Sequence, residues 1–151
     1  MNKITPFLWF DTEAEDAANF YMSVFPEAKK LDELRSSGVG PWPEGALATI
    51  TIELMGQPMT FMNGGPDHPH TDAFSYSVAC KNQAEIDSYW ARLTADGGQE
   101  IACGWLKDKY GLRWQIVPEN IAELVRSPKG FTAMMHMVKF DIAALEAAAR
   151  S

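Results

Sequence analysis

Apolar and polar positions in the first 65 residues predict a strand, a helix and three further strands. A helix is predicted where apolar residues fall at positions i, i+3, i+4 and i+7, because this spacing places them on one helical face. Strict alternation over residues 49–54 predicts a half-buried strand, since successive side chains of a strand point to opposite faces. The strands are expected at 4–10, 28–35, 49–54 and 59–62, and the helix around the apolar stripe Ala17, Phe20, Tyr21 and Val24.

The predicted helix has signals at both ends. The segment Thr12 to Glu15 fits a capping box, in which the Thr hydroxyl and the Glu carboxylate each bind a backbone amide. Pro26 is expected to end the helix. Residues 36–45 contain three glycines and two prolines, so they are predicted to form a loop.

The same order of elements restarts in the second half of the chain. A strand over 74–78 precedes a helix that Asn82 caps, and a hairpin follows over 101–107 and 112–117. Two copies of one pattern indicate an internal duplication. Chance likeness between two ordinary helices is the alternative, and the matching order of elements favours duplication. The second helical stripe is Ile86, Tyr89, Trp90 and Leu93, each 69 residues after its counterpart (17 to 86, 24 to 93).

These patterns predict an α+β fold of two β-α-β-β-β modules within a single domain, residues 1–151. Module one is expected at about 1–65 and module two at about 71–118, with a helical tail over 119–151. In the tail, Ser127 before a proline and Asp141 are expected to cap helices.

Alternation along the strands separates two sheet faces. One set is expected to pack under the helices: Ile50, Ile52, Leu54, Phe74, Tyr76, Val78, Trp114 and Ile116. The opposite set is mostly polar: Thr49, Thr51, Glu53, Ser75, Ser77, Arg113 and Gln115. A polar sheet face is either exposed to solvent or lines a polar cavity, and the alternation leaves both open. An exposed face is the more common arrangement for an antiparallel sheet.

Charge and composition exclude several classes of partner. The net charge is −7, the pI is about 4.9, and no Lys/Arg cluster is present, so nucleic acid and anionic membrane surfaces are not expected partners. No segment approaches the ~20 apolar residues of a membrane span. The N-terminus lacks the pattern of a signal peptide, and the two cysteines give no disulfide framework. We therefore expect a cytoplasmic protein with reduced thiols.

Two stretches of the chain resemble a known family. The first combines Leu8-Trp9-Phe10-Asp11 with Phe20-Tyr21 and Phe25-Pro26. The second runs from Cys103-Gly104-Trp105 through Gly111 to Trp114-Gln115-Ile116-Val117-Pro118. They are similar to the PhnB-like branch of the vicinal oxygen chelate superfamily, whose relatives are glyoxalase I, bleomycin-resistance proteins and extradiol dioxygenases. The resemblance covers nearly the whole chain, including the Met-rich tail and residues 139–142.

The resemblance implies curved mixed sheets around a concave cavity, and usually a homodimer. It also implies that the polar sheet face lines this cavity. Members of this branch often carry the label demethylubiquinone methyltransferase. A usual methyl-donor site needs a Gly-rich turn between a strand and a helix. The glycine groups of this chain lie in other contexts, and they are Gly38/Gly40, Gly64-Gly65 and Gly97-Gly98. We therefore disfavour methyl transfer.

Catalytic members of the superfamily bind a divalent metal through His and Glu on the first and last strands of each module. The resemblance places these positions near Thr5, within 59–61, at Ala73 and at Gln115. Divalent metals prefer imidazole, carboxylate or thiolate ligands, and none of these positions supplies one. Only Gln115 could ligate well, through its amide oxygen, and Thr5 is a poor neutral ligand. We therefore predict no metal centre of this type and no cofactor. The cluster of His68 and His70, with Asp67 and Asp72, is expected to be a solvated turn between the modules.

Other side chains could carry chemistry. Cys80 and Cys103 are either small buried thiols or reactive ones, and reactivity would need a nearby base or cation. Glu53 could act as a general base and Arg113 could hold an anionic group, but a Glu–Arg pair or two solvated charges is the more common case. Four aromatic residues could form an apolar pocket wall or plain core: Phe7, Trp9, Trp42 and Trp105. Met134, Met135 and Met137 are expected to pack helices or to form a dimer contact.

The function favoured by these residues is metal-independent binding of a small, partly aromatic or amphipathic molecule on the concave sheet. The alternatives are a lyase, isomerase or dioxygenase with a non-standard site, in which Glu53, Cys80 or Cys103 would act, and the methyltransferase of the family label. The residues expected to contact the ligand are Phe7, Trp9, Glu53, Ser75, Ser77, Trp105, Arg113 and Gln115.

Overall fold

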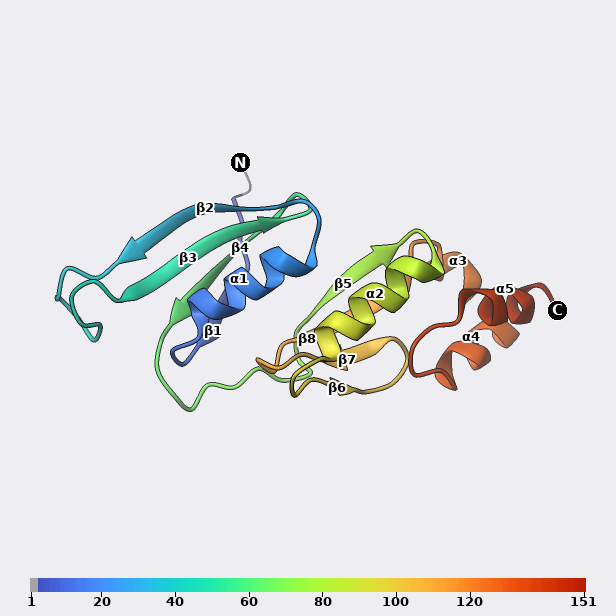
Figure 1. The fold of residues 1–151 in the computed structure, drawn as a ribbon. Coiled ribbons are helices and arrows are strands. Elements are labelled where there is room, and N and C mark those ends of the chain that lie inside the picture. Colours follow the sequence, from blue (N-terminus) through green and yellow to red (C-terminus); the bar gives the residue numbers. More distant parts are fainter. Residues whose placement is uncertain (1–2) are drawn as a thin grey trace. The chain divides into compact units, whose positions relative to one another are not determined.

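The computed structural model describes residues 3–151, and the chain divides into two compact units. One comprises the chain up to Pro69 and the other is His70–Ser151. Each unit contains a β-α-β-β-β module, and the second also contains three further helices (Figure 1). The predicted first module, 1–65, includes Met1 and Asn2, which lie outside the described residues.

The first unit is a four-stranded mixed sheet with one helix on one face (Figure 1). Its strand order is β1-β4-β3-β2, with β1 parallel to β4 and the other pairs antiparallel. Tyr21 of the helix meets Phe61 of the sheet edge to face, with ring centroids 5.6 Å apart. Its elements are β1 (Phe7–Phe10), α1 (Ala14–Val24), β2 (Ala28–Arg35), β3 (Leu47–Leu54) and β4 (Gln57–Asn63).

The second unit repeats this topology. The strand order is β5-β8-β7-β6, with β5 parallel to β8, and α2 supplies buried Ile86 and Leu93 to the core. The repeated order confirms the predicted α+β fold of two β-α-β-β-β modules. The elements are β5 (Ser75–Cys80), α2 (Gln83–Thr94), β6 (Gln99–Glu100), β7 (Trp105–Lys107) and β8 (Arg113–Pro118).

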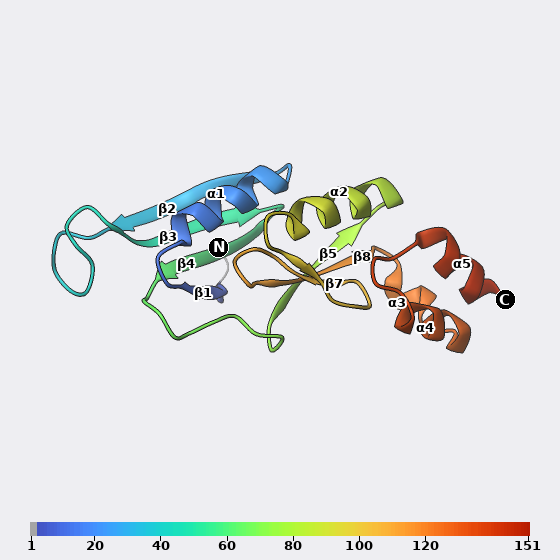
Figure 2. The same ribbon diagram turned by 60° about the horizontal axis from the view of Figure 1, so that its bottom comes forward.

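The tail forms three helices, α3 (Ile121–Leu124), α4 (Pro128–Met135) and α5 (Ile142–Arg150) (Figure 2). The predicted caps are confirmed, because the Ser127 hydroxyl accepts from the Gly130 amide and the Asp141 carboxylate accepts from the Ala144 amide. No helix in residues 3–151 combines the length and apolar character needed to cross a membrane.

A few specific contacts hold the helical tail against the β-α-β-β-β module of the second unit. The Phe140 ring is 1% exposed and packs against Gly104. The Gln83 side-chain amide donates to the Phe140 carbonyl at 2.8 Å and accepts from the Ile142 amide at 2.8 Å. The start of α2 therefore holds the chain just before α5.

Three local predictions were wrong. The capping box at Thr12 does not form, since α1 begins at Ala14 and no side chain of its own segment caps it. Phe74 was expected under a helix, but it precedes β5 and is 45% exposed. Residues 101–104 were expected in a strand, but β6 ends at Glu100 and the chain turns at Cys103, whose φ is +54°.

Candidate functional site

Two threonine hydroxyls mark the open face of the first sheet, on the side opposite α1. Thr51 of β3 lies opposite Thr60 of β4, and their hydroxyl oxygens are 2.8 Å apart. Ile50 and Ile52 face the buried side, while Thr51 and Glu53 are half-buried on the other. The predicted alternation of β3 is therefore confirmed.

This face carries a cavity of about 480 Å³. Among residues 3–151, Glu53 is the one charged residue that lines it, and its carboxylate lies 3.6 Å from the Lys29 ammonium. The Glu53 side chain is 31% exposed, so the pair stays in contact with water and is weak. The cavity thus combines three threonine hydroxyls and a carboxylate with apolar edges. It is lined by Thr5, Leu31, Thr51, Glu53, Gly56, Pro58 and Thr60.

The predicted aromatic wall is only partly available on this face. Phe7 pairs with Thr60 in the sheet and is 60% exposed. Trp9 is covered instead by the chain that follows β4. Its indole N–H donates to the Gly65 carbonyl at 2.8 Å, Gly64 lies against the indole ring, and the His68 ring centroid is 4.5 Å away. Trp9 therefore anchors the segment after β4.

The open face of the second unit brings together four of the predicted polar residues. Ser75 pairs with Arg113 and Ser77 with Gln115, and the Gln115 amide donates to the Ser75 hydroxyl at 2.9 Å. Trp105 pairs with Gln115 on the adjacent strand β7. These residues form a polar row with one aromatic neighbour.

Arg113 is already engaged within its own unit. Its guanidinium donates to the Asp72 carboxylate at 2.7 Å and to the carbonyls of His70 and Gly111. A Glu53–Arg113 pair was considered from the sequence, but Glu53 contacts Lys29 and Arg113 contacts Asp72. Arg113 thereby fixes the segment before β5.

The two cysteines differ in environment. Cys80 is 1% exposed, and burial, with a smaller contribution from the Glu85 carboxylate, raises the pKa of its thiol from 9.0 to about 12. A thiol with that pKa stays protonated at neutral pH and is a poor nucleophile. Cys103 is half-buried at the turn before β7, and its thiol donates to the Met135 carbonyl at 3.8 Å.

The residues at the metal-binding positions of the superfamily do not fit a divalent metal. Thr5 and Thr60 share the cavity in the first unit, and Gln115 bonds to Ser75 in the second. Neutral hydroxyls are poor ligands, and a single amide oxygen does not replace the imidazole and carboxylate ligands that a divalent metal prefers. Across residues 3–151, no three His, Cys, Asp or Glu side chains cluster as a metal site would require. The absence of a metal stays a prediction.

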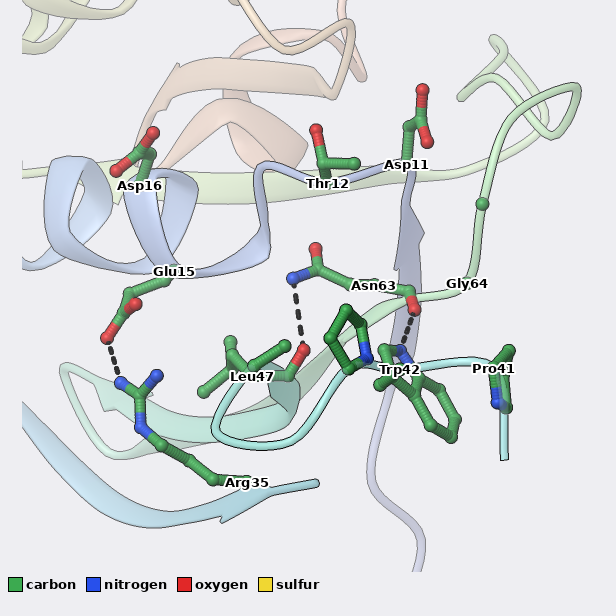
Figure 3. Close-up of a pocket in the computed structure, with 13 residues that line it drawn as sticks. Asp11, Thr12, Glu15, Asp16, Arg35, Pro41, Trp42, Leu47, Asn63 and Gly64 are labelled. Carbon is green, nitrogen blue, oxygen red and sulfur yellow. Dashed lines mark hydrogen bonds and ion pairs between the residues drawn. The ribbon is translucent and has the colours of Figure 1, made fainter. Parts of the chain in front are cut away.

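A second cavity, of about 580 Å³, lies at the start of α1 (Figure 3). Trp42, named from the sequence as a possible pocket wall, lines it together with Asp11 and Asn63. No sequence pattern predicted this cavity, because its walls come from three separated segments at 11–16, 35–47 and 63–65.

Comparisons with known proteins agree with this fold. The sequence model of the 3-demethylubiquinone-9 3-methyltransferase family matches residues 2–117. The chain belongs to this family. A structure described as a putative 3-demethylubiquinone-9 3-methyltransferase, PhnB protein, from Bacillus cereus is 33% identical, with a TM-score of 0.70, over 78% of this chain and 99% of that one. The resemblance to the PhnB-like branch is confirmed.

More distant structures show the shared fold alone. The protein PA1353 from Pseudomonas aeruginosa is 16% identical, with a TM-score of 0.61, over 79% of this chain and 98% of that one. The fosfomycin resistance protein FosX from Mesorhizobium loti is 12% identical, with a TM-score of 0.58, over 83% and 99%. No curated protein sequence matches this family member. The family match ends at residue 117, before the Met-rich tail that we included in the resemblance.

Proposed function

We propose that this family member binds a small, partly aromatic or amphipathic molecule on the open face of the first sheet, without a metal. The observation that carries the proposal is the cavity of about 480 Å³ at Thr51, Glu53 and Thr60. Its volume falls in the range of about 300–1,000 Å³ that small-molecule sites occupy.

The groups in the cavity define the ligand. The Glu53 carboxylate accepts hydrogen bonds, whereas the three threonine hydroxyls, of Thr5, Thr51 and Thr60, can donate or accept. Leu31 and Pro58 give the cavity apolar edges. A hydroxylated aromatic ring matches this combination, because its hydroxyls donate to the carboxylate while its ring covers the apolar edge. Within the second unit, the polar row of Ser75, Ser77, Trp105 and Gln115 is proposed as a ligand-contacting face of its own.

Methyl transfer is the less favoured alternative. The turn from β1 to α1 is Asp11–Glu13 and the turn from β5 to α2 is Lys81–Asn82, so neither contains glycine. A methyl-donor nucleotide bound in the usual way needs close backbone approach at such a turn. Binding of S-adenosylmethionine by calorimetry would favour this alternative over the proposed function.

A lyase, isomerase or dioxygenase is the other alternative, and it would depend on Glu53 as a base or on a metal. The first measurement is therefore the metal content per chain of untagged protein purified without chelators. Near-stoichiometric iron, manganese, nickel or zinc would overturn metal-independent binding.

The ligand class is tested with a matched pair of probes, catechol and 1,2-dimethoxybenzene, titrated in the presence of EDTA. We expect catechol to bind and its ether, which lacks donors, to bind more weakly. Because hydrogen bonds to charged groups contribute about 1.5–3 kcal/mol, Glu53→Gln should weaken catechol binding about tenfold or more. Glu44→Gln, which removes an exposed carboxylate outside the cavity lining, is the control. Equal binding of the two probes would overturn the proposal.

A further inference from the structure

The open face of the second sheet, on the side opposite α2 (Figure 1), carries two cations. Trp90 of α2 donates its indole N–H to the Glu100 carboxylate, and Glu100 pairs with Leu106 across β6 and β7. These side chains therefore lie on the α2 side of the sheet. Because successive side chains of a strand point to opposite faces, Lys107 lies on the open side. Its partner in register is Arg113 of β8.

The pairing of Lys107 with Arg113 brings two like charges together. Side chains directly opposite each other in an antiparallel pair have Cβ atoms about 4.5–5.5 Å apart, and like charges at such positions destabilise a sheet. No acidic residue of these strands shares the open face with them, in a unit that the structure describes completely. The neighbouring side chains on this face are neutral: Ser75, Ser77, Gln99, Trp105 and Gln115.

Both cations keep donors available. Arg113 donates through Nε to the Asp72 carboxylate and through Nη1 to two carbonyls, while its Nη2 group makes no hydrogen bond within residues 3–151. The Asp72 side chain is 74% exposed, so it compensates the guanidinium only in part. Lys107 is half-buried, and in the described part of the chain no acidic side chain pairs with its ammonium group. An ammonium and one guanidinium nitrogen can thus bind the same acceptor.

We propose that this face binds an aromatic carboxylate, with the carboxylate at Lys107 and Arg113 and the ring beside Trp105. The inference rests on the ligand-contacting face proposed above for the second unit, and it names the class of ligand. Lys107 and Trp105 are two residues apart on β7, so their side chains stand about 6.6 Å apart on one face. A carboxylate attached directly to a ring spans such a separation. Charge-assisted hydrogen bonds then hold one end of the ligand, and contact with the indole holds the other.

General attraction cannot explain anion binding here, because the protein has a net charge of −7 and repels anions as a whole. Benzoate is the probe, benzamide is the neutral molecule of the same shape, and acetate is the carboxylate without a ring. Calorimetry in a buffer free of carboxylate and phosphate should detect benzoate binding, with benzamide and acetate weaker by about threefold or more. Equal binding of benzoate and benzamide would overturn the proposal.

The variant that tests the site is Lys107→Gln. It should weaken benzoate binding about three- to tenfold, because it removes one charge-assisted bond. Lys129→Gln, which removes an exposed cation of α4, is the matched control and should leave benzoate binding unchanged. Trp105→Leu should weaken binding about two- to fivefold. Equal effects of Lys107→Gln and Lys129→Gln would overturn the assignment.

Two further readouts separate a binding role from a structural one. Lys107→Gln should not lower the melting temperature of the free protein, because the ammonium group has no acidic partner to lose and the like-charge pair is relieved. Benzoate should shift the resonances of the Trp105 indole and the Gln115 side-chain amide in the folded protein. A clear loss of stability in Lys107→Gln, or shifts spread over the surface, would contradict the proposal.

Catechol binding in the first unit distinguishes a failure of this inference from a failure of the proposed function. Lys107→Gln should leave catechol binding unchanged, and Glu53→Gln should leave benzoate binding unchanged. Catechol binding without benzoate binding would overturn this inference alone. Benzoate binding at Lys107, together with equal binding of catechol and its ether, would overturn only the proposal for the first sheet.

Discussion

The side-chain oxygen of Asn63, at the end of β4, accepts a hydrogen bond from the backbone amide of Ala14, at the start of α1, at 2.8 Å. The two residues are 49 positions apart in the chain. The first helix is thus capped from the sheet, and the residues that precede it supply no side-chain cap.

Replacing Asn63 by Ala should lower the free energy of unfolding by about 1–2 kcal/mol, the usual cost of losing an N-cap. Thr12→Ala should change it by less than about 0.5 kcal/mol, because Thr12 is exposed and caps nothing. Urea titration followed by far-UV circular dichroism measures both. A loss at Thr12 as large as that at Asn63 would contradict the cap assignment.

Gly104 should not tolerate a side chain. Its φ is +81°, and a Cβ atom would lie 2.6 Å from the Phe140 ring. Gly104→Ala should therefore destabilise the protein by about 2–4 kcal/mol, from the unfavourable backbone conformation and from overpacking. Gly111→Ala is the matched control, because its φ is +90° and nothing lies near the added atom. Thermal unfolding of the two variants should differ by the overpacking cost, and equal losses would exclude the Phe140 contact.

Asp108 is a buried charged residue at the β7–β8 turn, 1% exposed. Its carboxylate accepts from the amides of Tyr110 and Leu112 and from the Trp114 indole N–H. Asp108→Asn would place an amide N–H group toward one of these donors, so it should lower the free energy of unfolding by about 2–3 kcal/mol. In a double-mutant cycle with Trp114→Phe, the two losses should be less than additive. Strict additivity would show that the pair does not interact.

Cys80 should resist thiol reagents at neutral pH until the protein unfolds, whereas Cys103 should react first. The raised pKa also sets a pH dependence. The unfolded thiol ionises from pH 9.0 and the folded thiol only near 12, so this contribution to stability is complete below pH 9.0 and is lost as the pH rises toward 12. The difference in unfolding free energy between the protein and Cys80→Ala, measured against pH, isolates this group. A difference that stays constant above pH 9.0 would contradict the burial of the thiol.

The sequence was sufficient for the architecture because the architecture depends on local periodicity. The apolar stripe predicted α2, and its four residues are all buried: Ile86, Tyr89, Trp90 and Leu93. The alternation over 49–54 predicted β3, where Ile50, Ile52 and Leu54 are buried. The Asn82 cap was predictable because its partner, Glu85, lies three residues away.

Contacts between distant segments were not predictable in this way. Thr12 has the right residue type to cap α1, but the side chain of Asn63, at the end of β4, accepts from the Ala14 amide instead. Trp9 was expected to line a pocket, but the segment after β4 covers its ring. Glu53 does line a cavity, while its role there stays a prediction, as do a homodimer and a cytoplasmic location.

The contacts of Phe140 show that the compact second unit, His70–Ser151, extends beyond the segment that the family model matches. The family match ends at residue 117, yet the ring of Phe140 covers Gly104 and the chain around it is bonded to Gln83. A fragment trimmed to residue 117 would lose the buried ring of Phe140 and expose the surface at Gly104 that this ring covers. Such a fragment should aggregate more readily than the full chain, because it exposes apolar surface that the tail normally covers.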